Sequence, residues 1–366
     1  MARKKSPDDA FVKSIRLNCD ISDARDHGIY SVCVLVLKLR VLYKWEKGLE
    51  PWVEPGPAEV LDWIDQREGY WAGIAENEFQ PLELNGASFD PFDVEGVNGI
   101  LFADGLYYGA GYGRSMKPVF FLAEILEQRT LDGNTVLILG TEKARELAGP
   151  FAMRQERNII IRKQQLKYFL WDHLQEIRPS AKDVMLQALH KGNIIQQRCT
   201  ADREGLKNHL ARLVEQEIPI FVHHEIGEMQ ATPLSGGVFQ RIVSDFPDSL
   251  IEFFSRAVKD VLADTHPQGM LRFIINERRE MSLALYLSFM TGIGRTLFPE
   301  IVTVVRRFMV NGEGDWSDIE RAREAGWANN LARAERIAQI VMGSPENGAV
   351  AREMERELLA PLGLGR

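Results

Sequence analysis

MSLALYLSFM, residues 281–290, is apolar on nearly every side of a helix. A helix without a polar face is buried all round, so this segment is predicted to lie at the centre of a helical bundle. Apolar residues keep helical spacing on both sides of it. Helices are expected at 164–177, 181–191, 201–217, 219–230, 248–265, 269–291 and 299–308, followed by amphipathic helices over 316–359.

The N-terminal part changes its periodicity along the chain. Helices are expected at 9–18, at 27–47 and from Pro57, which suits a first helical turn. Four short runs rich in branched and aromatic residues then predict strands at 106–111, 118–128, 136–140 and 158–161. Asp132-Gly133 predicts a hairpin turn. Gly109-Ala-Gly111-Tyr-Gly113 precedes a strand rather than a helix, so a strand bend or bulge that uses glycine is favoured over a phosphate loop.

These patterns together predict an α+β protein that is mainly helical. It has a small antiparallel sheet in its N-terminal half and a helical bundle in its C-terminal half. Pro179-Ser180 is the expected boundary between a domain at 1–178 and an all-helical domain with a C-terminal helical arm at 179–366.

Charge and cysteine content limit the function classes. The chain has 366 residues and a formal charge of −8, which argues against a general affinity for nucleic acid or anionic membranes. A local basic group is expected to be a solvated face; its members are Arg154, Arg157, Arg162, Lys163 and Lys167. Cys19, Cys33 and Cys199 form no CxxC pair, which suits a reducing compartment and predicts the cytoplasm. Core thiols are expected, although Cys19 and Cys33 could face each other across neighbouring helices. No signal peptide or membrane-spanning segment is expected.

The cluster His223-His224-Glu225-Ile226-Gly227-Glu228 is the candidate for chemistry. His224 and Glu228 are four apart and share one helix face, whereas His223 lies off it. The HExxE spacing lacks the second histidine of HExxH zinc peptidases, so further ligands must come from elsewhere. Gly227, which is costly inside a helix, suggests that another backbone or a ligand approaches closely there.

The missing ligands are expected on the next helix, where Asp260 and Asp264 are also four apart. The hypothesis is that His224, Glu228 and Asp264 share a divalent ion (Zn, Fe or Mn), with Asp260 as a further ligand. Glu225 is the candidate general base on a bound water. His266, next to the aspartates, is expected in an exposed turn.

The alternative is a non-catalytic interaction or scaffold protein. In that case the His-Glu cluster is a structural core network, and the C-terminal helices dock a protein partner. Nucleic-acid binding would rest on the basic group alone and conflicts with the overall charge. The substrate and the oligomeric state stay open.

Four strings carry a family resemblance: NCDISDAR at 18–25, LKLRVLYKWE at 37–46, SFDPFD at 88–93 and HEIGE at 224–228. With these, the chain resembles an uncharacterised family of soluble bacterial proteins. The resemblance implies a two-part layout, and it implies no activity, cofactor or partner.

Overall fold

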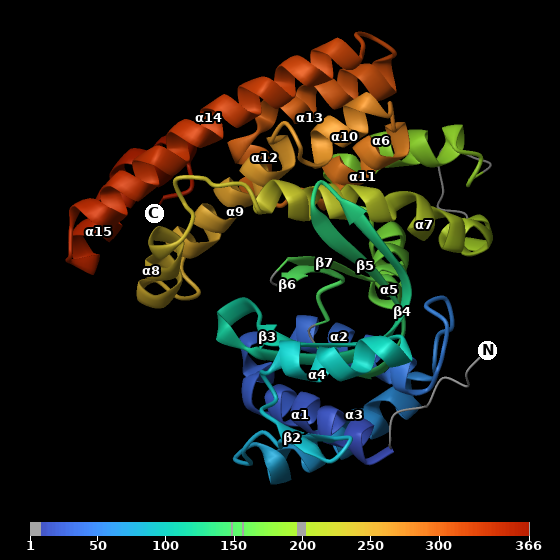
Figure 1. Cartoon of the computed structure of the whole chain (residues 1–366). Coiled ribbons are helices and arrows are strands. Elements are labelled where there is room, and N and C mark those ends of the chain that lie inside the picture. The colour runs from blue at the N-terminus through green and yellow to red at the C-terminus, as the bar shows by residue number, and fades with distance from the viewer. Residues whose placement is uncertain (1–8, 148, 156, 196–202, 366) are drawn as a thin grey trace. The chain divides into compact units, whose positions relative to one another are not determined.

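A computed structural model describes residues 9–147, 149–155, 157–195 and 203–365. The chain divides into two compact units, Met1–Asp172 and His173–Arg366 (Figure 1). The expected boundary, Pro179-Ser180, is the first turn of helix α6 (Pro179–Lys191). The mainly helical α+β class is confirmed.

Five α-helices lie within residues 9–175. They are α1 (Asp9–Asp26), α2 (Val32–Glu46), α3 (Pro57–Ile74), α4 (Val94–Leu101) and α5 (Lys163–Gln175), with short 3₁₀ turns at His27–Ile29, Phe102–Asp104 and Arg114–Met116. Pro57 occupies the first turn of α3, as predicted. Helix α4 has no long apolar repeat and was missed; Asp93 caps it by accepting a hydrogen bond from the Gly96 amide.

Within the described residues, seven strands form two sheets. β1 (Leu82–Leu84) and β2 (Ala87–Phe89) make a small ribbon. The larger sheet has the order β3-β4-β5-β7-β6, with β3 (Leu106–Tyr112), β4 (Pro118–Leu131), β5 (Asn134–Arg145), β6 (Ala152–Gln155) and β7 (Asn158–Arg162). The turn between β4 and β5 has positive φ at Asp132 and Gly133, as the hairpin prediction requires.

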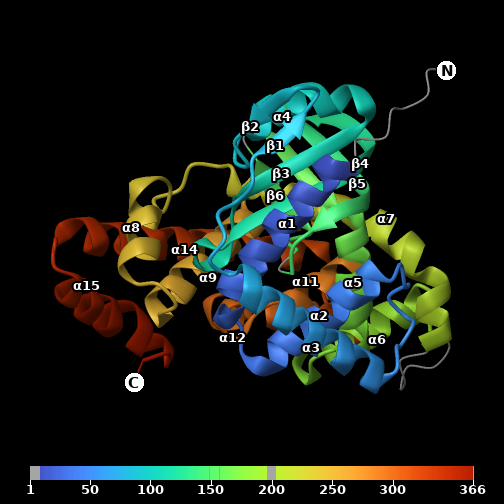
Figure 2. The ribbon, with the colours of Figure 1, turned by 90° about the horizontal axis from the view of Figure 1, so that it is seen from below.

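The larger sheet is mixed, and the expectation of a purely antiparallel sheet was wrong. β6 pairs at the outer edge of β7, so β7 enters the sheet parallel to β5. The sheet also curls until its two edges meet, as Figure 2 shows for β3 and β6. There the Tyr107 hydroxyl donates to Gln155 Oε1 (2.9 Å), and Gln155 Nε2 donates to the Ala110 carbonyl (2.5 Å).

The curled sheet is packed on both faces. One core cluster gathers alternating residues of the strands, namely Tyr107, Phe121, Ala123, Leu137, Leu139 and Ile160. A second joins the opposite face to residues of α1 and α4, including Ile15, Val97, Tyr108 and Phe120. Gly109 is needed in β3 because a Cβ there would lie 2.1 Å from the Phe121 ring. The strand predicted over the glycines is present, but β3 pairs with β4 in regular register through Gly109 and Gly111, so the predicted bend or bulge is not observed there.

The second unit is helical in its described part. After α6 it contains α7 (Arg203–Glu228), α8 (Gly237–Asp245), α9 (Leu250–Thr265), α10 (Met270–Asn276), α11 (Glu280–Phe289), α12 (Gly292–Leu297), α13 (Pro299–Arg306), α14 (Trp316–Gly343) and α15 (Asn347–Met354). π-helical turns follow α13 and α15 at Arg307–Asn311 and Glu355–Leu359, and a 3₁₀ turn follows at Ala360–Leu362. Helix α11 is buried from Ser282 to Ser288, which confirms its central position.

Helix continuity in the second unit differs from the prediction at Pro219 and at Arg278. Residues 203–228 form one helix that runs through Pro219, where two helices were expected; the buried residues Ile218 and Ile220 on either side hold it in the core. The single helix expected at 269–291 is two helices, because Arg278 adopts positive φ between α10 and α11.

The C-terminal helices belong to the body of the second unit. α14 packs on α9, α10 and α13, and buries Ile319, Ala334 and Ile337. Deleting residues 313–366 would therefore expose core residues of the second unit. Among the described residues, no helix is both long and apolar enough to cross a membrane.

Candidate metal centre

Helices α7 and α9 approach each other at their C-terminal ends with unusually little space between their backbones. A Cβ added at Gly227 would lie 2.1 Å from the carbonyl oxygen of Ala263. Only glycine fits at this crossing. The close backbone approach predicted from Gly227 is therefore present, and it brings His224 and Glu228 of α7 next to the acidic residues of α9.

His224 is held by Asp264. Its Nδ1 lies 2.7 Å from Asp264 Oδ1, which leaves Nε2 facing Glu228 Oε1 at 3.9 Å. Burial lowers the pKa of this histidine, but the carboxylates of Asp264, Glu228 and Glu225 raise it to about 10. Without another cation the imidazole is protonated at neutral pH, and both ring nitrogens are donors.

Three residues of α7 and α9 place potential metal-ligand atoms close together. One ligand atom each from His224, Glu228 and Asp260 lie within 4.8 Å of one another. The trio differs from the sequence hypothesis, which gave Asp264 the third position and Asp260 a supporting one. Asp264 bonds the far ring nitrogen instead, which is the position of the carboxylate that commonly orients a metal-bound histidine.

Solvent reaches this cluster. The side chains of His224 and Glu228 are 23% and 26% exposed, and Asp260 is exposed. Lys259 Nζ lies 3.3 Å from Glu228 Oε1 and neutralises part of the negative charge. Burial raises the pKa of Glu228, but the charges of His224 and Lys259 outweigh this and hold it below the usual value.

The candidate general base, Glu225, is one residue from His224 and is 6% exposed. Burial raises its pKa to about 7, although the charge of His224 acts in the opposite direction. Glu225 does not contribute to the gathered trio. Tyr286, a buried residue of α11, is also affected by the charges of the cluster. Burial and the nearby carboxylates of Asp264 and Asp260 raise its pKa well above the usual value.

The other histidines of this region lie apart from the trio. His223 stacks on Phe273 with ring centroids 4.3 Å apart, and its Nδ1 faces the Gln268 carbonyl. Its exclusion from the shared helix face is therefore confirmed. His266 packs edge-on against Trp327, and its Nδ1 accepts a hydrogen bond from the backbone amide of Gln268. Because of these contacts it is half-buried, whereas an exposed position was expected.

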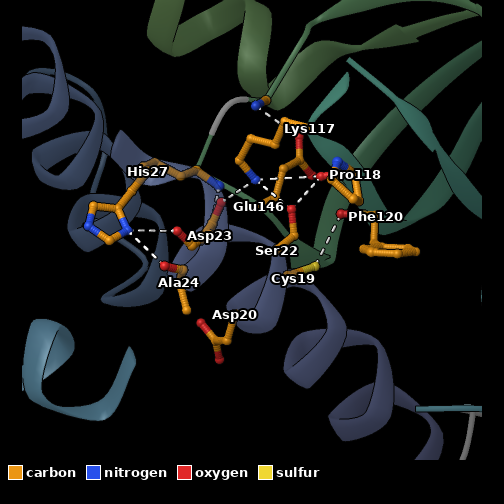
Figure 3. Close-up of polar contacts among 12 residues, drawn as sticks. Cys19, Asp20, Ser22, Asp23, Ala24, His27, Lys117, Pro118, Phe120 and Glu146 are labelled. Atoms are coloured by element: carbon orange, nitrogen blue, oxygen red, sulfur yellow. Dashed lines mark hydrogen bonds and ion pairs between the residues drawn. The ribbon is translucent and has the colours of Figure 1, made fainter. Parts of the chain in front are cut away.

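The first unit contains a second polar cluster, which the sequence did not predict (Figure 3). Lys117 Nζ lies 2.8 Å from Asp23 Oδ1 and 2.6 Å from Ser22 Oγ, and the Lys117 and Asp23 side chains are each 1% exposed. Asp23 also accepts a hydrogen bond from the Leu147 amide. Both charged groups are enclosed by protein partners, so we interpret this cluster as structural.

Burial of charge extends to the ends of β5 and β7. Arg162 Nε lies 2.5 Å from Glu142 and its Nη1 lies 3.1 Å from Glu146, with all three side chains fully buried. The prediction that Arg162 belongs to a solvated basic face was wrong. The sequence around Arg162 does not indicate its burial, because an arginine at the end of a strand can face either water or a buried carboxylate.

The cysteines fit no disulfide in the described chain. Cys19 is buried and donates to the Phe120 carbonyl at 3.1 Å, whereas Cys33 is exposed. The core-thiol prediction therefore holds for Cys19 and was wrong for Cys33. Cys199 lies outside the described residues.

Fold and site define a two-unit, mainly helical α+β protein with a His-carboxylate cluster in its helical unit. Residues 10–162 match the N-terminal domain, and residues 167–359 the C-terminal domain, of the DUF6866 family of unknown function. The chain belongs to this family, which confirms the resemblance to an uncharacterised family. Neither the curated proteins nor the solved structures give a significant match.

Proposed function

We propose that α7 and α9 bind one divalent metal ion through His224 Nε2 and the carboxylates of Glu228 and Asp260. The observation that carries the proposal is that one ligand atom from each of these three residues lies within 4.8 Å of the others. Asp264 holds Nδ1 of His224, so Nε2, which faces Glu228, is the nitrogen left for a metal. One imidazole and two carboxylates suit zinc, iron or manganese.

Charge supports a cation at this position. Four carboxylates surround His224: Glu225, Glu228, Asp260 and Asp264. In the metal-free chain they are compensated by Lys259 and by the proton on His224. A divalent ion would replace that proton, so binding releases a proton and weakens as pH falls.

The site has the openness of a reactive centre rather than a structural one. Structural zinc sites are closed by four protein ligands, whereas reactive sites use three and leave a position for water. Here three ligands are solvent-accessible. We assign the acid–base role to Glu225, because a carboxyl group that titrates near neutral pH suits proton transfer. The metal would supply Lewis-acid activation of bound water.

The competing function is a structural network in a non-catalytic interaction protein. The pairing of His224 with Asp264 and of Glu228 with Lys259 favours it, because both pairs form without a metal. The free, exposed thiol of Cys33 supports the cytoplasm as the compartment in either case, since such thiols persist in reducing conditions.

Calorimetric titration of chelator-treated protein with zinc and manganese separates the two functions. We expect one ion per chain, with affinity lost in His224→Gln and strongly reduced in Asp260→Asn. Asp264→Asn should weaken binding about 10–100-fold through loss of orientation. Glu215→Gln, an exposed acid on the same helix, is the control and should bind like the wild type. Absence of binding, or equal binding by Asp260→Asn, would establish the structural network instead.

A further inference from the structure

A separate cavity lies in the first unit, where the two edges of the curled sheet meet beneath α4. Its volume is about 240 Å³. It is lined by α4, by the turn after it, and by β3, β6 and β7; the lining residues used below are Glu95, Gly99, Phe102, Tyr107, Gln155 and Asn158. None of these belongs to the candidate metal centre.

The walls of the cavity are fixed by hydrogen bonds within the protein. Tyr107 and Gln155 bond to each other, and Gln155 also bonds to the backbone of β3. Asn98 exchanges two hydrogen bonds of 2.8 Å with the backbone of Tyr108. Because these polar groups are already oriented, a ligand would meet a preformed surface.

Two features of the lining select a cation. Phe102 and Tyr107 pack edge to face, with centroids 5.8 Å apart at 77°, so their rings form an aromatic corner. Glu95 is the sole charged side chain among the lining residues, it is exposed, and no ion pair holds it within the described part of the chain. A carboxylate beside aromatic rings attracts an ammonium or guanidinium group both by charge and through the ring faces.

The cavity also has open space where a ligand would enter. Gly99 lines it without a side chain, and a Cβ built there meets nothing within 4 Å. Phe102 is 38% exposed, so its ring is accessible to a ligand in the cavity. We infer that this cavity binds a small organic cation carrying an ammonium or guanidinium group, with Glu95 as its counter-ion.

Saturation-transfer NMR on the full chain tests this inference with n-butylguanidinium, and with n-butylurea as its neutral near-isostere. We expect millimolar binding of the cation and about tenfold weaker binding of the urea, as an exposed ion pair and a cation–π contact together imply. Glu95→Gln should remove this preference, and Gly99→Leu should abolish binding of both compounds by filling the cavity. Glu76→Gln, an exposed acid elsewhere in the first unit, should change neither.

Three results would overturn the inference. The first is no saturation transfer to the cation at about 20 mM, a concentration well above the dissociation constant expected for a fragment of this size. The others are equal binding of the cation and the urea, and an unchanged preference for the cation in Glu95→Gln. Circular dichroism spectra identical to the wild type establish that the variants fold, and Glu95 and Gly99 both lie on an exposed helix face, where substitution is tolerated.

Discussion

Gly227→Ala tests the helix crossing on which the candidate metal centre depends. The added Cβ would lie 2.1 Å from the Ala263 carbonyl oxygen, whereas ordinary contacts begin near 3.4 Å. The obstacle is backbone, so α7 and α9 must separate by about 1 Å. Overpacking of this kind costs about 1–3 kcal/mol or more. Because the clash is with backbone, the upper part of this range, about 2–3 kcal/mol, applies. Alanine returns up to about 1 kcal/mol in helix propensity, so a net loss of about 1–2 kcal/mol is expected.

The matched control is Gly73→Ala in α3. Gly73 is exposed and is the next-to-last residue of α3, as Gly227 is of α7, and a Cβ at Gly73 meets nothing within 4 Å. The same chemical change should therefore stabilise the protein by about 0.5–1 kcal/mol. Differential scanning calorimetry measures both variants, and metal titration should show that Gly227→Ala also weakens binding. A Gly227→Ala variant as stable as the wild type would refute the crossing geometry.

Three further predictions concern charge. Lys117→Met leaves Asp23 buried without its cation and should cost about 3–5 kcal/mol in urea unfolding, with partial recovery in Lys117→Met/Asp23→Asn; a loss below about 1 kcal/mol would contradict the buried pair. In metal-free protein the pKa of His224 is about 10, above its unfolded value of about 6.5, so its stabilising contribution is complete below pH 6.5 and is lost as pH rises through 10. The stability difference between wild type and His224→Gln should therefore shrink between pH 7 and pH 10, and a constant difference would exclude the pairing. His173 has the opposite pH dependence, because burial and, to a smaller extent, the charge of Arg178 lower its pKa to about 4. Stability is therefore lost as pH falls from about 6.5 through about 4, and His173→Gln should reduce this loss in acid unfolding curves. An unchanged loss of stability at acid pH in the variant would show that His173 is not buried in its neutral form.

Periodicity predicted the elements whose stability is local. The four strands predicted within 106–161 and the central helix at 281–290 were located correctly, because runs of branched and aromatic residues and all-round apolarity both indicate burial. The turn at Asp132-Gly133 was also predictable, since its residues tolerate positive φ. These features require no knowledge of distant partners.

Strand order and helix continuity could not be predicted in the same way. The position of β6 outside β7, which makes the sheet mixed, depends on pairing that no single strand encodes. Pro219 was read as a helix boundary because proline removes one backbone donor, yet the packing of its buried neighbours outweighs that loss. Arg278 breaks the helix expected at 269–291 without a glycine or proline to signal it.

For the candidate site, the helical spacing predicted the pair His224 and Glu228 and the helix that carries the acids. It could not decide which aspartate faces which ring nitrogen. Asp260 and Asp264 are four residues apart on one face of α9, so the sequence does not distinguish them. Their roles differ because the close contact at Gly227 fixes the position of α9 along α7. The buried Lys117–Asp23 pair could not be predicted either, because the two residues are far apart in the sequence.

The central claim is that a divalent ion binds between α7 and α9. Its most direct test is anomalous diffraction from crystals of the full chain grown with manganese. We predict a single strong peak, about 2.0–2.2 Å from His224 Nε2 and from a carboxylate oxygen of both Glu228 and Asp260. Asp264 should remain on Nδ1. A difference map without a peak there, with Lys259 still bonded to Glu228, would contradict the account.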